Sequence, residues 1–548
     1  MRKALKIALA VIAAVIVAAA IRYGYYAWQA HEWKQVAVTG GPVRPAQAAY
    51  DVRHYDLSIA IHPGSQTIDG RNVISVAVLK PLDRFEVQLD DRLHVGNVKV
   101  DGKPASFSHE GGLITVPLKQ SWQPGSRHAV AISYGGEPYV AVKPPWWDGF
   151  VWAHTPSGAP WIGVTSEGSG GDTWWPCKDS PSDEPDDGMA IALTVPGNLV
   201  GLSNGRKVGE THNPDGTITT HWNVSYPINN YDVTVNVAPY VPIKAPYHGI
   251  HGDLNKTIIF WALPEDANKA RKMWLREGAK ILTVLGKRFG EYPFLRDKYW
   301  VAEAPYKGME HQTIVAYGSD FKDNKYGFDG LLLHETAHEW WGNKVTARDW
   351  SDYWLHEGFA SYAEAVYVND TLGKAKYLEY MHRKCTHVKN EKPIVQGRNL
   401  IGDKAYIGDI YTKGACVLET LRWMIGDKLF FKALYDFQND PRFAYKLVST
   451  KDFIGLVDQL TGRDLGWFWQ RYVFKAAEPR YSMTRTAGSD TDTIDLKWRE
   501  PTFEVPLPVQ VDGKLRRIEM PHGEASFTVP HAAKVVVDPK GQVLAEPV

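Results

Sequence analysis

The chain of 548 residues is too long for one hydrophobic core and indicates about three domains. Hydrophobic residues make up 44% and charged residues 23% of it, which is the balance of a globular protein and argues against a disordered chain. The 62 basic and 62 acidic residues cancel, so the net charge indicates no nucleic-acid partner.

Residues 1–30 have the pattern of a membrane-targeting segment. Arg2, Lys3 and Lys6 precede an apolar run from Ile7 to Ile21, and several aromatic residues follow it. The basic start keeps the N-terminus in the cytoplasm and sends the rest of the chain across the membrane. The aromatic residues favour an uncleaved, single-pass anchor in a bacterial-type inner membrane, with the remaining chain facing the periplasm. Because the run is short for a span of about 20 residues, a cleaved signal peptide and a secreted or periplasmic protein are the alternative.

Residues 47–245 are predicted to form an antiparallel β domain. Apolar side chains alternate with polar or small ones in runs such as Leu57 to Ile61 and Val130 to Tyr134, and turn dipeptides such as Pro63-Gly64 lie between or near the runs. The three cysteines allow at most one disulfide and lack the spacing of a zinc site.

Residues 246–475 are predicted to be mainly helical. Asp266 to Phe289 carries apolar residues at helical spacing. From residue 478 to 548 alternation returns, for example from Val505 to Val511, and predicts a small C-terminal β-sandwich.

The chemistry-bearing motif of the helical region is His334-Glu335-x-x-His338. Residues four apart lie on one helix face, so the two imidazoles can bind one metal ion. Glu357 follows after eighteen intervening residues, within the helix expected from Ser351 to Tyr367, and supplies the third ligand of a catalytic zinc site. Glu335 is the candidate general base. Glu364 is a candidate to hold a ligand histidine by its second ring nitrogen, with a solvated glutamate on the helix face as the alternative.

The segments HETAHEWWGNKVT and DYWLHEGFASY resemble the aminopeptidase N-like zinc metallopeptidases, or gluzincins, the family that also contains the leukotriene-hydrolysing epoxide hydrolase. The resemblance implies an α+β multidomain fold, in which a thermolysin-like catalytic domain binds one Zn²⁺ per chain. His356 stands where the family usually has Asn, which puts the neighbouring hydrogen bonds in question. The long C-terminal helical domain of many members has no counterpart before Val548, which predicts a more open cleft.

The same resemblance implies residues that bind substrate. Lys307-Gly308-Met309-Glu310-His311 resembles the G-x-M-E-N motif, in which the backbone pairs with an extended peptide and the glutamate binds its N-terminal ammonium. Lys307 and His311 depart from that motif, so the finer peptide specificity is open. Glu167 precedes the proline of a P-C-x-D-x-P-like segment by nine residues, at the position where the family places a second ammonium-binding residue. Taken alone, Glu167 is a solvated loop glutamate.

Two tyrosines complete the site that the resemblance implies. Tyr411 lies in Y-x-K-G and is expected to stabilise the oxyanion, and Tyr406 matches a second active-site tyrosine. Without the resemblance, Tyr411 is a core aromatic residue.

Together these features predict a zinc aminopeptidase acting on peptides with a free N-terminus. Two alternatives stay open: another hydrolase on the same site, either an endopeptidase or an epoxide hydrolase, and a non-enzymatic envelope protein with structural zinc. The first is distinguished by Glu310 with Glu167, because an internal peptide bond has no ammonium. The second is disfavoured because a structural site normally has four protein ligands.

Overall fold

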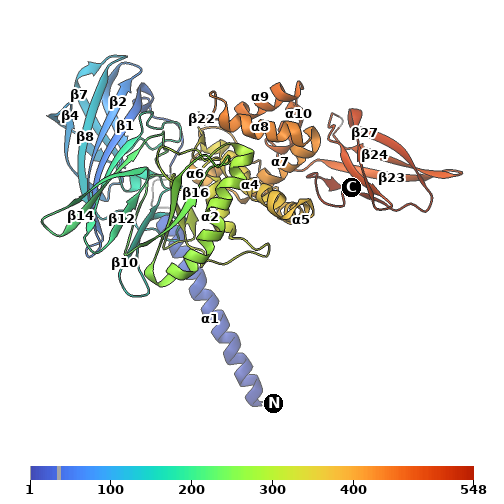
Figure 1. Ribbon diagram of the computed structural model, residues 1–548, viewed down its shortest axis with the longest axis horizontal. Coiled ribbons are helices and arrows are strands. Elements are labelled where there is room, and N and C mark those ends of the chain that lie inside the picture. Colours follow the sequence, from blue (N-terminus) through green and yellow to red (C-terminus); the bar gives the residue numbers. More distant parts are fainter. Residues whose placement is uncertain (1, 34–38, 501) are drawn as a thin grey trace.

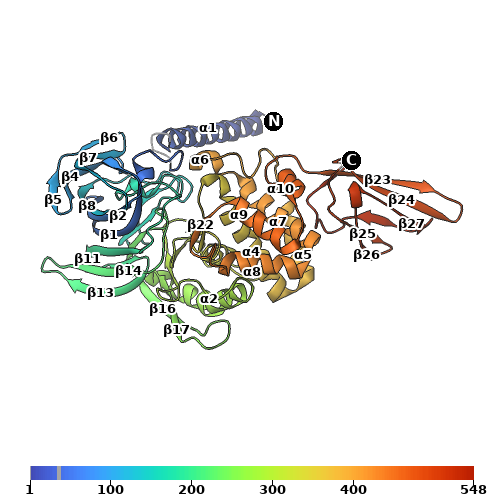
Figure 2. The same ribbon diagram turned by 90° about the horizontal axis from the view of Figure 1, so that it is seen from above.

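The computed structural model describes residues 2–33, 39–500 and 502–548. A long helix leads into three consecutive parts: a β-rich part, a helical part and a second, smaller β part (Figure 1). Seen from above, the three parts lie in a row, with the helical part in the middle (Figure 2). The predicted α+β multidomain fold is therefore confirmed.

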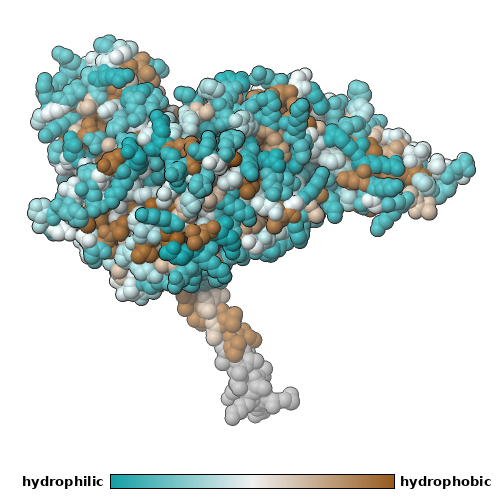
Figure 3. Space-filling model, viewed as in Figure 1, coloured by the Kyte–Doolittle hydropathy of each residue, from teal (hydrophilic) through white to brown (hydrophobic). Residues whose placement is uncertain are grey.

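Helix α1 (Arg2–Trp33) stands out from the body (Figure 1). Its segment Val11–His31 is long and apolar enough to cross a membrane. Residues 11–28 of this helix are exposed, and their apolar surface contrasts with the mostly hydrophilic body (Figure 3). Near its end, Gln29 Nε2 donates to the carbonyl of Val142 at 2.9 Å, which fastens α1 to the β-rich part.

The β-rich part contains three sheets. The largest has the strand order β13-β14-β11-β1-β2-β8-β4-β5, and two smaller sheets have the orders β12-β15-β10-β9 and β3-β7-β6. All pairs in the large sheet are antiparallel except β1 with β11. The strands are β1 (Tyr50–His62), β2 (Thr67–Val78), β3 (Leu82–Gln88), β4 (Leu93–Val100), β5 (Lys103–Ala105), β6 (Ser108–Glu110), β7 (Leu113–Trp122), β8 (Arg127–Gly136), β9 (Gly149–His154), β10 (Pro160–Thr165), β11 (Met189–Pro196), β12 (Val200–Ser203), β13 (Arg206–His212), β14 (Thr217–Val224) and β15 (Val235–Ala238).

The alternation seen in the sequence corresponds to the two faces of these strands. Leu57, Ile59 and Ile61 on β1 are buried, and Ile74, Val76 and the other apolar partners on β2 meet them in one core. Strand residues two apart lie on the same face, so this pattern selects the register that keeps the apolar face inside.

The helical part begins with a five-stranded sheet of order β16-β17-β18-β20-β19, so β16 pairs with this sheet. Its strands are β16 (Val241–Tyr247), β17 (Lys256–Ala262), β18 (Trp300–Glu303), β19 (Gly308–Met309) and β20 (Ile314–Tyr317), and a further pair joins β21 (Val345–Ala347) to β22 (Lys446–Val448). The helices are α2 (Ala267–Phe289), α3 (Gly330–Ala337), α4 (Trp354–Leu372), α5 (Lys374–Cys385), α6 (Gly402–Ala405), α7 (Thr412–Ile425), α8 (Asp427–Asn439), α9 (Thr450–Thr461) and α10 (Gly466–Tyr472).

The C-terminal part consists of two sheets, of orders β27-β24-β23-β29 and β26-β25-β28. It shares one hydrophobic core with the helical part, since Trp498 and Val509 belong to the same cluster as the helix residues. Its strands are β23 (Arg480–Ala487), β24 (Thr491–Trp498), β25 (Leu507–Val511), β26 (Lys514–Ile518), β27 (Glu524–Pro530), β28 (Val535–Val537) and β29 (Glu546–Pro547).

Candidate metal centre and active site

Helix α3 carries His334 and Glu335, and its start is fixed by a side-chain cap. The carboxylate of Asp329 accepts a hydrogen bond from the amide of Leu332 at 3.0 Å. The helix ends at Ala337, and His338 follows with helical backbone angles. His334 and His338 therefore stay one turn apart on the same face, as the motif predicts.

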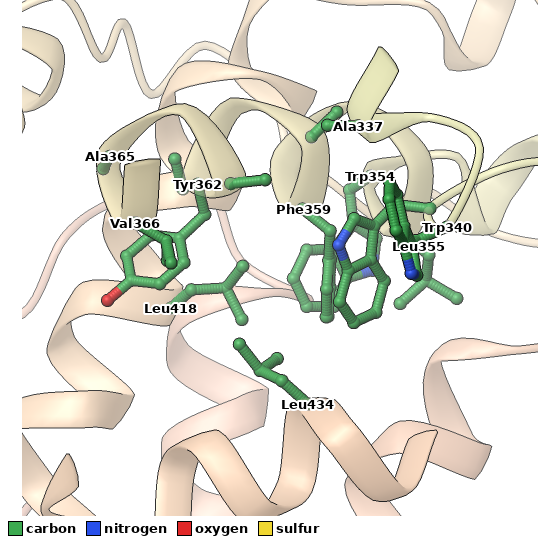
Figure 4. Packing of buried hydrophobic residues seen from close by; sticks show 14 of the residues in the cluster. Ala337, Trp340, Trp354, Leu355, Phe359, Tyr362, Ala365, Val366, Leu418 and Leu434 are labelled. Atoms are coloured by element: carbon green, nitrogen blue, oxygen red, sulfur yellow. The ribbon is translucent and has the colours of Figure 1, made fainter. Parts of the chain in front are cut away.

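Helix α4 carries Glu357. It begins at Trp354, three residues later than the expected start at Ser351, and Trp350–Asp352 forms a short 3₁₀ turn before it. Almost every residue of its first three turns is buried, which identifies α4 as a central helix. Trp340, Trp354 and Phe359 pack together between α4 and the helices carrying Leu418 and Leu434 (Figure 4). Each such large apolar side chain contributes about 1.5–3 kcal/mol on burial, so α3 and α4 are held rigidly together.

The three proposed ligand atoms face one another. His334 Nε2 lies 3.2 Å from His338 Nε2, and Glu357 Oε2 lies 3.3 Å and 3.4 Å from these two nitrogens. Three corners of a tetrahedron drawn at zinc–ligand distances of about 2.0–2.1 Å are about 3.3 Å apart, so the separations match a tetrahedral zinc site with its fourth corner open. Glu357 Oε2 is buried and makes no hydrogen bond within the described part of the chain. The donor set therefore fits a zinc ion.

The other ring nitrogen of each histidine is held by the protein. His334 Nδ1 lies 2.7 Å from Glu364 Oε1, and His338 Nδ1 lies 2.9 Å from the carbonyl of Trp341. Both acceptors require a proton on Nδ1, so each Nε2 presents a lone pair to the centre. Glu364 thus makes the contact expected of it.

Glu335 is buried beside this centre and lines the cleft. Burial raises the pKa of Glu335 to about 7, against the lowering effect of His334. Gly308 on β19 passes close by: a Cβ at this position would lie 2.7 Å from Glu335 Oε1. Only glycine lets this strand run next to the candidate base.

Glu310, Glu167 and Glu357 form a cluster in which their carboxylate oxygens lie within 4.8 Å of one another. Glu167 is buried, so the solvated-loop alternative for it is wrong. Burial is the main cause that raises the pKa of Glu167, and the negative charges of Glu310 and Glu357 raise it further. Burial also raises the pKa of Glu310. Packed carboxylates of this kind repel one another unless positive charge lies between them. A metal ion at Glu357 and an ammonium group at Glu310 and Glu167 would supply that charge.

Tyr231 is a site residue that the sequence did not reveal. Its hydroxyl donates to Glu310 Oε1 at 3.1 Å and lies 3.5 Å from His356 Nδ1. His356 Nε2 accepts from the amide of Ala347 at 2.7 Å, so its proton is on Nδ1, facing Tyr231. Burial lowers the pKa of His356 to about 3, which keeps the ring neutral. His356 at the usual Asn position is therefore a hydrogen-bonded support for Tyr231.

Tyr411 and Tyr406 reach the centre from the turn before α7. Their hydroxyls are hydrogen-bonded to each other, and Tyr406 also donates to Glu357 Oε1 at 3.3 Å. Both tyrosines line the cleft, so Tyr411 is no ordinary core residue. Their approach depends on two glycines: a Cβ on Gly414 of α7 would lie 2.9 Å from Gly358 Cα of α4.

The cleft has a volume of about 510 Å³, and every predicted site residue lines it. Met309 and Gly308 form β19, the edge strand of the five-stranded sheet, whose outer side can accept an extended peptide. Trp146 and Lys307 line the same cleft. His311 is buried outside it, and burial lowers its pKa to about 3.

Comparison with known proteins agrees with this geometry. Residues 279–472 match the peptidase family M1 domain. The matched residues include the candidate metal ligands His334, His338 and Glu357, so this part of the chain is similar to the M1 peptidase family. This is a family of zinc metallopeptidases, as the resemblance implied.

Three relatives show how far the similarity extends. Human endoplasmic reticulum aminopeptidase 2 is 24% identical over 299 residues, 51% of this chain and 30% of that protein. Aminopeptidase N of Canis lupus familiaris is 28% identical over 304 residues, 50% of this chain and 30% of that protein. Aminopeptidase B of Mus musculus is 22% identical over 456 residues, 74% of this chain and 65% of that protein. The matched part of this chain thus spans less than a third of the first two relatives.

A solved structure shows the same fold. The M1 zinc metallopeptidase of Deinococcus radiodurans superposes with a TM-score of 0.67 at 24% identity, over 79% of this chain and 95% of that chain. A variant of that enzyme has been solved with a Tyr-Ser-Ala substrate.

Proposed function

We propose that this protein is an aminopeptidase that binds one zinc ion per chain and hydrolyses the first peptide bond of peptides with a free N-terminus. The observation that carries the proposal is the buried carboxylate cluster of Glu310 and Glu167 next to Glu357. The named aminopeptidases among the relatives support it.

The centre needs a metal ion and a base. His334, His338 and Glu357 would hold a zinc ion, which would supply Lewis acidity and lower the pKa of a bound water to about 7. Glu335 accepts the proton of the attacking water and returns it to the leaving amine. Burial raises the pKa of Glu335 above that of an exposed glutamate, which is the direction that a general base working at neutral pH needs.

The remaining residues orient the peptide and stabilise charge. Glu310 and Glu167 bind the ammonium, and each charge-assisted hydrogen bond contributes about 1.5–3 kcal/mol that an internal bond cannot obtain. Gly308 and Met309 pair with the peptide backbone through the free edge of β19. The hydroxyl of Tyr411 donates to the carbonyl oxygen as it gains negative charge, and Tyr406 positions that hydroxyl.

The test compares amino acid amides and aminoacyl-naphthylamides with their N-acetylated forms. We expect cleavage of the free-amine substrates only, and a loss of about 10-fold or more in kcat/KM in Glu310→Gln, because that variant keeps the shape but not the charge. Glu303→Gln is the matched control, since Glu303 is buried away from the cleft and bonds the amide of Leu263. Equal cleavage of acetylated substrates would instead indicate an endopeptidase, and hydrolysis of an epoxide alone would indicate an epoxide hydrolase.

We further propose that α1 is an uncleaved anchor and that the catalytic part lies outside the cytosol, facing the periplasm in a bacterial-type cell. A disulfide joins Cys385 to Cys416, and such bonds persist in oxidising compartments. Mass spectrometry of the N-terminus, together with alkaline extraction of membranes, tests the anchor. A mature chain that starts after the apolar run and is released in soluble form would contradict the anchor and support a cleaved signal peptide.

A further inference from the structure

A second cavity, of about 330 Å³, adjoins the active-site cleft. It is walled by the loop before α3, by the end of α5 and by the start of α7, with the side chains of Lys325, Tyr380, Arg383, Lys384, His387 and Thr412. Asn324 lines both the cleft and this cavity. The two spaces are therefore neighbours, and we call the second one the basic cavity.

The cationic groups of the basic cavity differ in their partners. Lys384 lies 3.1 Å from Glu364 Oε2, and Lys325 lies 3.1 Å from Glu379 Oε1. The guanidinium of Arg383 has no ion pair or hydrogen bond to any residue that the structure describes. His387 uses Nδ1 to reach the carbonyl of Arg383 at 2.8 Å. Arg383 is thus the cation left to bind an anion, with the two lysines adding to the positive potential.

The basic cavity adjoins the side of the His334 ring that faces away from Glu357, because its Lys384 contacts Glu364 and Glu364 contacts His334 Nδ1. Glu357, which clusters with Glu310 and Glu167, lies 3.3 Å from Nε2 of His334, and Glu364 lies 2.7 Å from Nδ1 of the same ring, so the ring separates the two carboxylates. Glu364 contacts Lys384 of the basic cavity. Along α4, residues 357 and 364 are about 10 Å apart, a length that about three residues of an extended peptide cover at about 3.3–3.6 Å per residue.

The walls of the basic cavity are covalently joined. The Cys385–Cys416 disulfide ties the residue after Lys384 to the turn of α7 that follows Thr412. It therefore fixes the cationic end of α5 against α7, which starts directly after Tyr411.

We propose that the basic cavity binds a substrate carboxylate, namely the C-terminal carboxylate of peptides about three residues long, with Arg383 as its principal contact. The proposal rests on the proposed function, because it assumes that the ammonium end of the peptide lies at Glu310 and Glu167. It makes the protein a peptidase of short peptides, held by charge at both ends. Arg383 lines the basic cavity and not the active-site cleft, so we expect it to determine which substrates bind and not to take part in the reaction.

The test measures kcat/KM for Ala-Ala-Ala, for its C-terminal amide, and for Ala-Ala-Asp amide, whose only carboxylate is a side chain. We expect the free acid to be cleaved about 10-fold or more better than the amide, mainly through KM. Arg383→Ala should reduce this ratio to about one while leaving cleavage of the amide unchanged, and Arg383→Lys should restore part of it. Arg516→Ala on β26 is the matched control, because Arg516 is exposed and belongs to the C-terminal sheets.

Binding measured by calorimetry with Glu335→Gln separates this proposal from the proposed function. We expect Glu335→Gln to bind the free acid more tightly than the amide, and we expect this difference to disappear in the double variant that also carries Arg383→Ala. That result would support carboxylate binding in the basic cavity, whatever the specificity of turnover. If Ala-Ala-Asp amide matches the free acid, the cavity accepts a carboxylate from a side chain as well. Equal binding of the free acid and both amides would overturn the proposal, even if all three are cleaved as aminopeptidase substrates.

Discussion

The proposed ammonium site at Glu310 is held by a chain of hydrogen bonds that begins outside the cleft. The amide of Ala347 fixes the tautomer of His356, His356 faces Tyr231, and Tyr231 donates to Glu310. Of the groups joined by these hydrogen bonds, only the carboxylate of Glu310 carries a full charge. The buried carboxylate therefore keeps its orientation without an ion pair that would neutralise it, and its charge is free to meet an ammonium.

Tyr231→Phe tests this support. We expect kcat/KM for free-amine substrates to fall about 10-fold, mainly through KM, since a hydrogen bond to a charged group contributes about 1.5–3 kcal/mol. Tyr240→Phe loses a similarly buried hydroxyl bond, to the carbonyl of Glu303, away from the cleft and should leave kinetics unchanged. An unchanged KM in Tyr231→Phe would show that Glu310 needs no such support.

The placement of His334 relative to His338, and of Glu357 relative to Glu364, was predictable because each pair is local in the sequence. One helical turn separates the two histidines, and a single helix displays Glu357 and Glu364. The role of Tyr231 was not predictable, because Tyr231 lies 79 residues from Glu310 and contacts it only through the packing of two parts of the chain. Arg383 was missed for the same reason: its neighbours come from three separate segments.

At the scale of elements, the contact between α4 and α7 places the two tyrosines at the metal centre. Gly358 directly follows Glu357, and Gly414 lies three residues after Tyr411. Because neither carries a side chain, the helices approach until a Cβ would lie 2.9 Å from the opposite Cα. The periodicity of the sequence predicted helices here but not this close approach, which depends on how two helices cross.

Gly414→Ala should separate the two helices. We expect a loss of about 1–3 kcal/mol in the free energy of unfolding from overpacking, and a fall in kcat as Tyr411 is displaced. Gly455→Ala on α9 is the matched control: nothing lies within 4 Å of its added Cβ, so it should be neutral or stabilising. Wild-type kcat in Gly414→Ala would mean that Tyr411 does not depend on this contact.

The disulfide is a second element-scale constraint, closing a loop of 31 residues between α5 and α7. Cys385→Ser should lower the free energy of unfolding by about 3–4 kcal/mol, the loop-closure value for this length. Chemical denaturation of the oxidised and reduced wild-type protein should show the same difference. If reduction leaves the midpoint unchanged, the bond does not form in the native protein.

Across the whole molecule, residues 39–41 connect the β-rich part to the helical part. The amide of Thr39 donates to the carbonyl of Gly168 at 3.2 Å, beside Glu167, and its carbonyl accepts from Gly402 at 3.0 Å, in the segment leading to Tyr406. Gly40 has a φ of +93°, and a Cβ there would lie 2.4 Å from Trp350 Cδ1. The chain that follows α1 thus fastens the β-rich part to the helical part at the cleft.

Gly40→Ala should weaken this fastening. Backbone strain of about 1–3 kcal/mol and the clash with Trp350 predict a lower thermal unfolding temperature and a weaker kcat/KM for free-amine substrates. Gly64→Ala, in an exposed turn with open space around it, should change neither quantity. A wild-type unfolding temperature in Gly40→Ala would contradict the proposed importance of residues 39–41.

The division into β-rich, helical and C-terminal β parts was predictable, because the change from a period of two to a helical period is written along the chain. The contacts that join these parts were not, since residues 39–41 are too short and irregular to have a period. The parallel pairing of β1 with β11 was missed too, because alternation defines the faces of a strand and not its partner.

The most direct test of the metal centre measures zinc content and turnover together in Glu335→Gln. We expect one zinc ion per chain, as in the wild type, and a loss of turnover of more than about 1,000-fold, while Glu357→Gln loses the zinc as well. Removal of zinc from the wild type by a chelator should abolish activity, and added zinc should restore it. Near-wild-type turnover in Glu335→Gln, or full zinc retention in Glu357→Gln, would contradict the assignment of base and ligand.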